Sequence, residues 1–318
     1  MNAIPPFALV IHGGAGTIRR TDMTPELERD YHAGLRRSLA AGQRILAEGG
    51  TALDAATEAV VVLEDDPLFN AGRGAVFTAA GEIELDAAVM DGRDRAAGAV
   101  SGVIGPRNPV RAARAVLEHS SAVLLQGEGA LEFCREAGMV IEPADYFHTE
   151  RRWQALQQEL ERRRSGAPDQ RDDSDRHGTV GAVALDADGN LAAATSTGGM
   201  TAKPAGRVGD TPIFGAGTWA RNGVCAVSAT GSGEFFVRQC SGHELDARMR
   251  LGGQSLAAAA TAVVQELAAD GGDGGLIAVD SAGNIALPLN CQGMYRGVAI
   301  GHEPIMTAIY ADEQLAEH

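Results

Sequence analysis

A polar segment that ends abruptly at a threonine is the feature of this sequence that most constrains its fold. Residues 165–178 carry Ala167 as their one apolar side chain, whereas residues 179–185 read Thr-Val-Gly-Ala-Val-Ala-Leu. The first composition is typical of a linker and the second of a buried strand. A chain cut between the two would begin with Thr179, so the junction is a candidate cleavage site.

A free N-terminal threonine combines a nucleophile and a base in one residue. Its Oγ1 attacks while its own α-amine, which titrates near pH ~8, accepts the proton. Gly178 supports this interpretation because a residue without Cβ can adopt the strained backbone that self-cleavage requires. Taken alone, Gly178-Thr179-Val180 is better explained as an uncut surface loop entering a strand, so the other motifs decide between the two.

Composition and charge exclude several classes of protein. The 318 residues suffice for one large domain or two small ones, and 45% hydrophobic with 22% charged residues is ordinary for a soluble globular protein. The net charge of −15, with no basic run longer than Arg162-Arg163-Arg164, argues against nucleic acid or an anionic membrane as a partner. Four cysteines without a C-x-x-C pair argue against a zinc ribbon or a redox motif.

We also expect a cytoplasmic protein. The N-terminus lacks the basic start and the long apolar core of a signal peptide. No apolar run approaches the roughly 20 residues that span a bilayer. The cysteine usage fits a reducing compartment.

Apolar periodicity predicts alternating strands and helices. In the first half we expect strands at 7–11, 82–91 and 97–104 and helices at 24–48, 51–66, 109–118, 127–137 and around Trp153, Leu156 and Leu160. In the second half, two similar hairpins turn at Asp186–Asn190 and Asp280–Asn284, and a helix covers 255–267. The hairpin strands are apolar on both faces, so we predict helix layers outside packed sheets.

The glycine-rich run His12-Gly13-Gly14-Ala15-Gly16 favours a tight packing turn. It lacks the Lys-Ser/Thr ending of a phosphate loop and does not fit G-x-G-x-x-G, so nucleotide binding is disfavoured. We interpret His12 as a hydrogen-bonded structural residue. The seven other histidines show no metal-ligand spacing, and none is assigned to chemistry. The absence of G-x-S-x-G argues against an α/β-hydrolase.

Three motifs in the second half contain candidate catalytic or substrate-binding residues. Thr195–Met200 brings hydroxyls and amides to a strand end within reach of Thr179. Arg207 and Asp210 could clamp the two charges of an amino-acid head group, although a loop salt bridge explains the pair equally well. Ala229–Glu234 is a strand-to-helix turn whose amides suit an oxyanion hole.

Together these motifs resemble the plant-type asparaginases, also called isoaspartyl aminopeptidases, in order from about residue 7 to about 310. The matching segments are HGGAG at 12–16, PLFNAG at 67–72, GTVGAVA at 178–184, TSTGGMT at 195–201, GRVGD at 206–210 and TGSGE at 230–234. The resemblance implies an N-terminal-nucleophile hydrolase with an α+β, four-layer αββα sandwich. It implies one domain, 1–318, that cleaves itself into an α-chain, 1–178, and a β-chain, 179–318, and assembles as a dimer of αβ units, a heterotetramer.

The resemblance also implies the roles of individual residues. Thr179 would be the nucleophile, Thr197 its neighbour, and Thr230 with the Gly231 amide the oxyanion hole. Arg207 would hold the substrate α-carboxylate and Asp210 its α-ammonium. The substrate-binding set implied by the family is completed by Gly231, Gly233 and Asn70.

A structural sodium ion is implied as well, bound by main-chain carbonyls of the loop from Leu63 to Arg73. The candidate ligands are the carbonyls of Leu63, Glu64, Asp66, Phe69, Ala71 and Arg73. No cofactor is implied for catalysis.

The activity implied is that of a β-aspartyl dipeptidase with L-asparaginase activity, acting on small molecules. Glycosylasparaginase, which shares the fold, is the nearest alternative, but it normally follows the secretory route and tends to carry Asp before the nucleophile. A threonine aspartase acting on proteins is more distant. A non-catalytic glycine-rich binding module, with Thr179 internal, is an alternative of another class.

Overall fold

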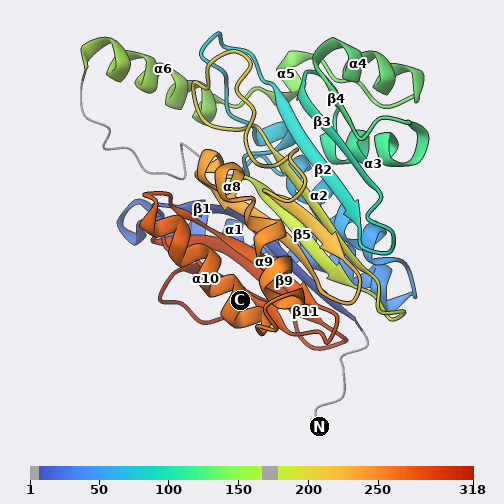
Figure 1. The fold of residues 1–318 in the computed structure, drawn as a ribbon. Helices are drawn as coiled ribbons and strands as arrows, with labels where there is room; N and C mark the ends of the chain where they lie inside the picture. Colours follow the sequence, from blue (N-terminus) through green and yellow to red (C-terminus); the bar gives the residue numbers. More distant parts are fainter. Residues whose placement is uncertain (1–6, 167–177) are drawn as a thin grey trace.

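Two β-sheets and the helices that contact them make up the fold (Figure 1). The computed structural model describes residues 7–166 and 178–318. The larger sheet has eight strands in the order β12-β11-β1-β5-β6-β2-β3-β4, and the smaller has four in the order β10-β9-β8-β7. The chain therefore mixes helices with sheets, which is consistent with the predicted α+β class.

The strands are β1 (Ala8–Gly16), β2 (Leu85–Asp91), β3 (Ala97–Val103), β4 (Leu124–Gln126), β5 (Val180–Leu185), β6 (Leu191–Thr197), β7 (Thr218–Arg221), β8 (Cys225–Gly231), β9 (Gly274–Asp280), β10 (Ile285–Ala286), β11 (Gly293–Ile300) and β12 (Met306–Tyr310). The helices are α1 (Pro25–Ala47), α2 (Ala52–Asp65), α3 (Pro109–His119), α4 (Gly127–Glu136), α5 (Ala144–Phe147), α6 (Glu150–Ser165), α8 (Gly233–Gln239), α9 (Ser241–Arg250) and α10 (Leu256–Ala269), with 3₁₀ turns η1 (Arg20–Asp22) and η2 (Gly72–Gly74).

The sheets contact each other, and each also contacts helices. Strands β1, β5 and β6 contact β8, while α1 and α2 contact the eight-stranded sheet and α9 and α10 the four-stranded one. In Figure 1, α9 and α10 lie in front with β9, and α1 and α2 lie behind.

Alternate residues of β1 belong to two different apolar cores. Leu9 and Ile11 pack with the core of α1 and α2, whereas Ala8 and Val10 pack with the core of β8, β9 and α10. Because side chains of a strand alternate between faces, a strand covered on both sides must be apolar throughout. Strand β5 of the first predicted hairpin alternates in the same way, with Ala182 in the first core and Val183 in the second, so the prediction that this strand is covered on both sides is confirmed.

Helix starts follow the capping residues in the sequence. Thr24 accepts a hydrogen bond from the Leu27 amide and is followed by Pro25, the first residue of α1. Thr51 and Ser255 cap α2 and α10 in the same way. A side-chain oxygen at this position satisfies an amide that the helix leaves unpaired, so the predicted starts hold to within a residue.

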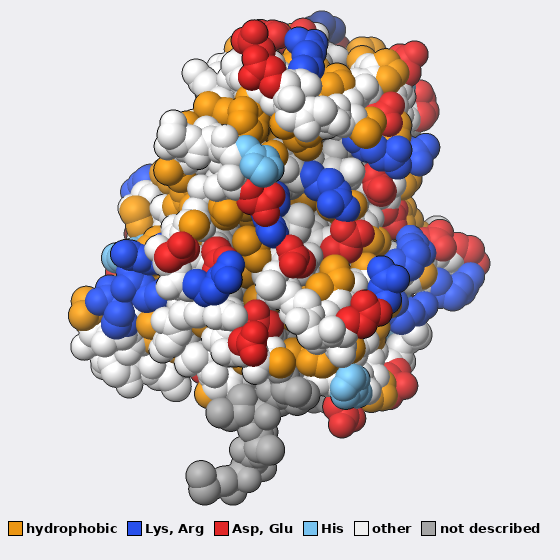
Figure 2. Space-filling model, turned by 90° about the vertical axis from the view of Figure 1, so that its right-hand side faces the viewer, with side chains coloured by type: hydrophobic (Ala, Val, Ile, Leu, Met, Phe, Trp, Pro, Cys, Tyr) orange, Lys and Arg blue, Asp and Glu red, His pale blue; other side chains and the backbone are white. Residues whose placement is uncertain are grey.

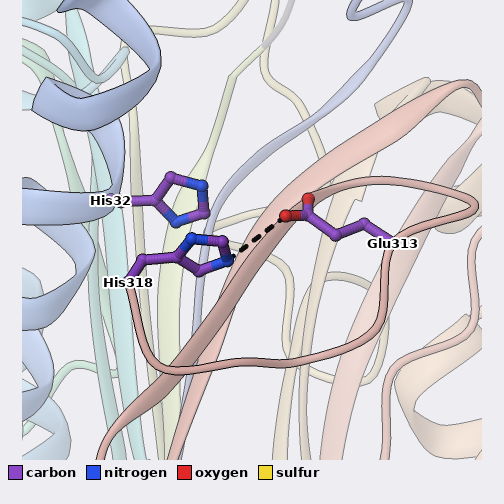
Figure 3. Close-up of side chains that lie close together, drawn as sticks. All are labelled: His32, Glu313 and His318. Carbon is purple, nitrogen blue, oxygen red and sulfur yellow. Dashed lines mark ion pairs between the residues drawn. The ribbon is translucent and has the colours of Figure 1, made fainter. Parts of the chain in front are cut away.

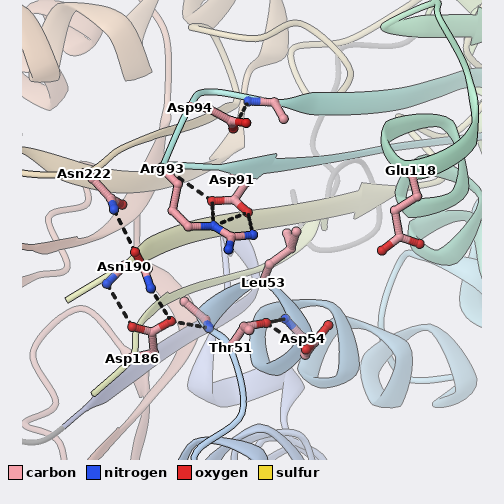
Figure 4. Close-up of polar contacts among 12 residues, drawn as sticks. Thr51, Leu53, Asp54, Asp91, Arg93, Asp94, Glu118, Asp186, Asn190 and Asn222 are labelled. Atoms are coloured by element: carbon pink, nitrogen blue, oxygen red, sulfur yellow. Dashed lines mark hydrogen bonds and ion pairs between the residues drawn. The ribbon is translucent and has the colours of Figure 1, made fainter. Parts of the chain in front are cut away.

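Both predicted hairpin turns are closed by an aspartate. Asp186 Oδ1 accepts from the amides of Asp188 and Asn190 at 3.1 and 2.8 Å, and Asp280 repeats this pattern with Ala282 and Asn284. Figure 4 shows Asp186 together with Asn190, Asn222 and the start of α2, where the Asp186 Oδ2 accepts from the Ala52 amide. This network lies at the end of β5 opposite to Thr179.

Three sequence predictions need correction. Strand β1 does not end at Ile11 but runs to Gly16, with a register shift between His12 and Ala15 that the glycines permit. Strand β2 begins at Leu85 rather than at residue 82, and the second strand of the later hairpin is only Ile285–Ala286. Most of the predicted linker, residues 167–177, lies outside the described residues.

The surface shown in Figure 2 carries acidic and basic side chains interspersed over the same face. Among the described residues, none of the helices combines the length and the apolar character needed to cross a bilayer.

Candidate active site

Strand register places the two central threonines side by side. Val180 of β5 pairs with Ser196 of β6, so Thr179 lies next to Thr197. The Thr179 hydroxyl donates to Thr197 Oγ1 at 3.1 Å, and Thr197 Oγ1 also accepts from the Gly199 amide at 2.9 Å. Both threonines are buried. The predicted approach of these two residues is confirmed.

Gly178 occupies a position that only glycine fits. Its φ of 151° lies in a region that L-residues with a Cβ avoid, and a Cβ there would lie 3.0 Å from the Cβ of Asn70. Gly14 packs against it so closely that a Cβ on Gly14 would lie 2.7 Å from the Gly178 Cα. The scissile residue of the predicted cleavage is thus held between β1 and the loop containing Asn70.

Both polar atoms of the Asn70 side chain form hydrogen bonds with the main chain. Its Nδ2 donates to the Gly199 carbonyl at 2.8 Å, and its Oδ1 accepts from the Val76 amide at 2.9 Å. The side chain is buried. Asn70 therefore positions the Gly198-Gly199 turn beside Thr197, and its role as a substrate ligand stays a prediction.

His12 fixes the main chain of the nucleophile. Its Nδ1 lies 3.0 Å from the Thr179 carbonyl oxygen, which can only accept, so Nδ1 carries the proton. Nε2 then accepts from Ser228 Oγ at 2.8 Å. Burial lowers the pKa of His12 to about 3, so the ring is neutral. The interpretation of His12 as a hydrogen-bonded structural residue is confirmed.

Two further hydroxyls extend the hydrogen bonds of His12 and Ser228 away from Thr179. Ser228 Oγ lies 2.8 Å from Thr195 Oγ1, and the Thr218 hydroxyl donates to Thr195 at 2.7 Å. A Cβ on Gly181 would collide with Ser228 Oγ, which explains the glycine after Val180. Sequence reasoning missed the roles of Ser228 and Thr218 because no local pattern brings residues of four strands together. We call His12, Ser228, Thr195 and Thr218 the hydroxyl–imidazole network.

Thr230 and Gly231 end β8 where α8 begins. Thr230 Oγ1 accepts from the Ala15 amide at 3.3 Å, next to the Gly14 that packs on Gly178. Gly231 has a φ of 140°, and a Cβ there would collide with the main chain of Asp273. The predicted strand-to-helix turn is confirmed; the oxyanion role of the pair stays a prediction.

Arg207 and Asp210 face the same glycine. A Cβ on Gly233 would lie 2.8 Å from Asp210 Oδ1 and 3.2 Å from Arg207 Nη2. Arg207 also donates to both carboxylate oxygens of Glu234, at 2.9 and 3.1 Å. The structure therefore brings the two predicted clamp residues together, and it adds Glu234 as the partner that holds the guanidinium.

Asp210 is a buried carboxyl that could accept a further hydrogen bond. Its Oδ2 has no hydrogen-bond partner among the described residues. Burial raises the pKa of Asp210 to about 7, with Arg207 acting in the opposite direction. A substrate ammonium would supply the missing donor and favour the ionised carboxylate.

The loop predicted to bind sodium has carbonyls that fit a hard cation. Leu63 and Glu64 lie in the last turn of α2, whose carbonyls lack donors within the helix. The Glu64 and Phe69 carbonyls approach the small residues Gly72 and Gly74 closely, so that no side chain would fit between them. Oxygen ligands are what such ions prefer. The type of donor fits such an ion, whereas the Asp66 and Ala71 carbonyls already accept from the Phe69 and Gly74 amides at 3.2 and 3.1 Å, and the ion itself stays a prediction.

A cavity of about 280 Å³ adjoins a small hollow beside Gly178 rather than the Arg207–Asp210 pair. Ile18, Tyr31 and Tyr295 line both the cavity and the hollow. The head-group site is instead outlined by close contacts around Gly233.

Comparison with known proteins identifies the family. The asparaginase family matches residues 5–309. The chain belongs to the asparaginase family. It is 51% identical over 310 residues to an isoaspartyl peptidase of Salmonella typhimurium, covering 96% of this chain and 98% of the relative. It is 50% identical to an isoaspartyl peptidase of Escherichia coli, with 96% of each covered. A plant-type L-asparaginase of Pyrococcus abyssi is 40% identical over 90% of this chain and 94% of its own length.

Proposed function

We propose that this protein is a β-aspartyl dipeptidase with L-asparaginase activity that works through Thr179. The observation that carries the proposal is the hydroxyl pair of Thr179 and Thr197 at 3.1 Å, immediately after Gly178. The curated relatives named isoaspartyl peptidase support the same activity.

Maturation begins with attack by Thr179 Oγ1 on the Gly178 carbonyl carbon. The Gly178–Thr179 C–N bond breaks, an ester to Oγ1 forms, and the nitrogen gains the proton that the hydroxyl loses, which makes it a free amine. Water then hydrolyses the ester and releases the carboxylate of Gly178. The positive φ of Gly178 and its close packing on Gly14 support strain at this bond.

The mature site uses the same atoms on substrate. The Thr179 amine takes the hydroxyl proton as Oγ1 attacks the side-chain carbonyl of the aspartyl group. The negative oxygen that develops is stabilised by Thr230 and the Gly231 amide. The amine or ammonia leaves with a proton, and water hydrolyses the β-aspartyl ester to aspartate.

Arg207 and Asp210 select the head group. Arg207 pairs with the α-carboxylate, Asp210 with the α-ammonium, and Gly233 leaves room between them. A β-linked substrate keeps both charges free. An α-linked aspartyl peptide does not, because its α-carboxylate is consumed in the peptide bond.

The architecture we propose is a single domain with four layers, αββα. The helix contacts outside each sheet and the sheet-to-sheet contacts support it. We also propose that the α-chain and β-chain pair into a dimer of αβ units in the cytoplasm, with sodium in the loop after α2.

Intact mass and a denaturing gel test the proposed nucleophile. Wild-type protein should separate into chains of residues 1–178 and 179–318, whereas Thr179→Ala should remain one chain because no hydroxyl can attack. Wild-type protein that stays whole after long incubation would favour the binding-module alternative.

The choice of dipeptide tests the clamp. Mature enzyme should hydrolyse β-Asp-Leu and leave α-Asp-Leu untouched, and Arg207→Ala should lose the first activity while it still matures. Losing a buried charge-assisted pair costs roughly 2–5 kcal/mol. Comparable rates on both dipeptides would point to a general threonine peptidase instead.

A further inference from the structure

Three potential metal ligands gather where the end of the chain meets α1. His32 lies in α1, Glu313 follows β12, and His318 is the last residue of the sequence. One donor atom of each lies within 4.8 Å of the other two (Figure 3). These two histidines show no metal-ligand spacing in the sequence, because 285 intervening residues separate them.

One buried nitrogen of His32 has no hydrogen-bond partner in the part of the chain that the structure describes. Its Nδ1 lies 2.8 Å from Thr307 Oγ1, but no described residue provides a hydrogen bond to Nε2. Only 3% of the residue is exposed. Leaving a buried polar group without a hydrogen bond is unfavourable, and the described residues supply no partner for Nε2. A bound ligand would satisfy this nitrogen. With Nδ1 as donor to Thr307, the lone pair of Nε2 is available to a metal ion.

Glu313 is held with one oxygen turned toward the histidines. Its Oε2 accepts from the amides of Ile309 and Tyr310 at 2.6 and 3.0 Å. Its Oε1 lies 3.3 Å from His318 Nε2. Arg296 also donates to the Glu313 carbonyl at 2.8 Å, which fixes the turn. The carboxylate is therefore preorganised, with one oxygen in the position of a ligand.

The backbone delivers His318 to the same place. Thr307 and Ala316 exchange two main-chain hydrogen bonds, at 2.9 and 3.1 Å, and Arg36 donates to the His318 carbonyl. The His318 ring stacks on that of His32 with centroids 3.8 Å apart. Because stacked rings do not direct two lone pairs at one point, His318 must rotate out of the stack to coordinate. Its side chain is 32% exposed, which leaves it room to do so.

We propose that His32, Glu313 and His318 bind a divalent transition-metal ion of the Zn²⁺ type. Two imidazoles and a carboxylate are a donor set that such ions prefer, with water completing a tetrahedral site. Two further charged side chains lie near His32: the acidic Glu28 and the basic Arg36. The ion would clamp the final segment onto α1. It would take no part in the chemistry at Thr179.

Calorimetric titration with ZnCl₂ tests the site, using mature protein without a polyhistidine tag and stripped with a chelator. Wild type should bind one Zn²⁺ per αβ unit, and Co²⁺ should give the intense visible absorption of a four-coordinate site. His32→Gln and His318→Gln should each weaken binding by more than about 100-fold. His318→Gln is the safer variant for folding, because that side chain is partly exposed.

Two further variants separate a built site from surface binding. Thr307→Val removes the hydroxyl that orients His32 and should weaken Zn²⁺ binding about 10- to 100-fold, as outer-shell partners do. His119→Gln is the matched control: His119 is 67% exposed and its Nε2 lies 3.9 Å from Glu118, but the described residues place no third ligand beside this pair, so the variant should bind like wild type. The proposal is overturned if wild type shows no stoichiometric binding, or if His318→Gln binds as wild type does.

Discussion

At the scale of single residues, the hydrogen-bond partners of a threonine hydroxyl decide what that hydroxyl can do. Thr230 Oγ1 accepts from the Ala15 amide, so its own hydrogen remains available to donate. Thr197 Oγ1 accepts from both Gly199 and Thr179, so it also keeps its hydrogen but is in direct contact with the nucleophile. This contact suits Thr197 to orienting the Thr179 hydroxyl, whereas Thr230 can stabilise a negative oxygen.

Thr230→Ala tests the first of these tasks. Removing an oxyanion donor typically lowers turnover ~10²–10³-fold, because the interaction forms only in the transition state. We therefore expect kcat to fall by that factor with KM little changed, measured on β-Asp-Leu with protein whose maturation is confirmed by mass. Thr57→Ala, which removes a buried hydroxyl bonded to the Leu53 carbonyl in α2, is the control. Near-wild-type kcat in mature Thr230→Ala would remove Thr230 from the oxyanion hole.

Asp210 makes head-group binding depend on pH. Its pKa is raised to about 7, so below that pH the carboxyl is neutral in the free enzyme and cannot pair with an ammonium. Inhibition by L-aspartate should weaken about tenfold per pH unit below 7. Succinate lacks the ammonium and serves as the control, since its inhibition should not weaken in this way. Parallel pH profiles for the two inhibitors would show that Asp210 does not bind the ammonium.

At the scale of elements, the hydroxyl–imidazole network joins the two sheets. His12 and Thr195 belong to β1 and β6 of the larger sheet, while Ser228 and Thr218 belong to β8 and β7 of the smaller. The network ends on the Thr179 carbonyl. Packing between the sheets is thereby linked to the position of the residue that opens β5.

Ser228→Ala should weaken this link. It leaves His12 Nε2 without its donor in a buried site, at a cost of about 1–3 kcal/mol in the free energy of unfolding. We expect slower cleavage at Gly178–Thr179 as well, followed on denaturing gels over time. Ser38→Ala is the control, since Ser38 is a buried serine that donates to the Ala59 carbonyl at 2.8 Å within the helices. If both variants mature equally fast, the network has a purely structural role.

At the scale of the whole molecule, a buried acid ties stability to pH. Glu64 is fully buried, with Oε1 accepting from the Val110 amide and Oε2 unpaired among the described residues. Burial raises its pKa from 4.5 to about 8. Between these values the native state holds a proton that the unfolded chain has released, so stability falls as pH rises.

Glu64→Gln should remove that dependence. The wild-type free energy of unfolding should fall with a contribution of up to about 1.4 kcal/mol per pH unit from this group between pH 4.5 and 8. Glutamine keeps an acceptor for Val110 and has no proton to lose. Denaturant unfolding in a Thr179→Ala background keeps the chain in one piece. An unchanged slope in the Gln variant would mean that Glu64 is ionised in the native protein.

Much of the local structure follows from the sequence alone. Caps such as Thr24 and Thr51, and the Asp-to-Asn turns at 186–190 and 280–284, act over a few residues and specify helix starts and hairpins directly. The register of one hairpin then places Thr179 beside Thr197. For this reason we could predict from the sequence the junction at Gly178, the head-group motif and the family.

Tertiary structure decided what depends on contacts between distant segments. His12 reaches Thr179 across 167 residues and Ser228 across 216, and His32 meets the end of the chain only through β12. The raised pKa of Asp210 likewise comes from burial, which no neighbouring residue in the sequence reveals. Sequence pattern determines which elements form and which side chains they carry, because those choices are local. Which polar atoms are buried, paired or left unsatisfied is decided only when the sheets and helices pack.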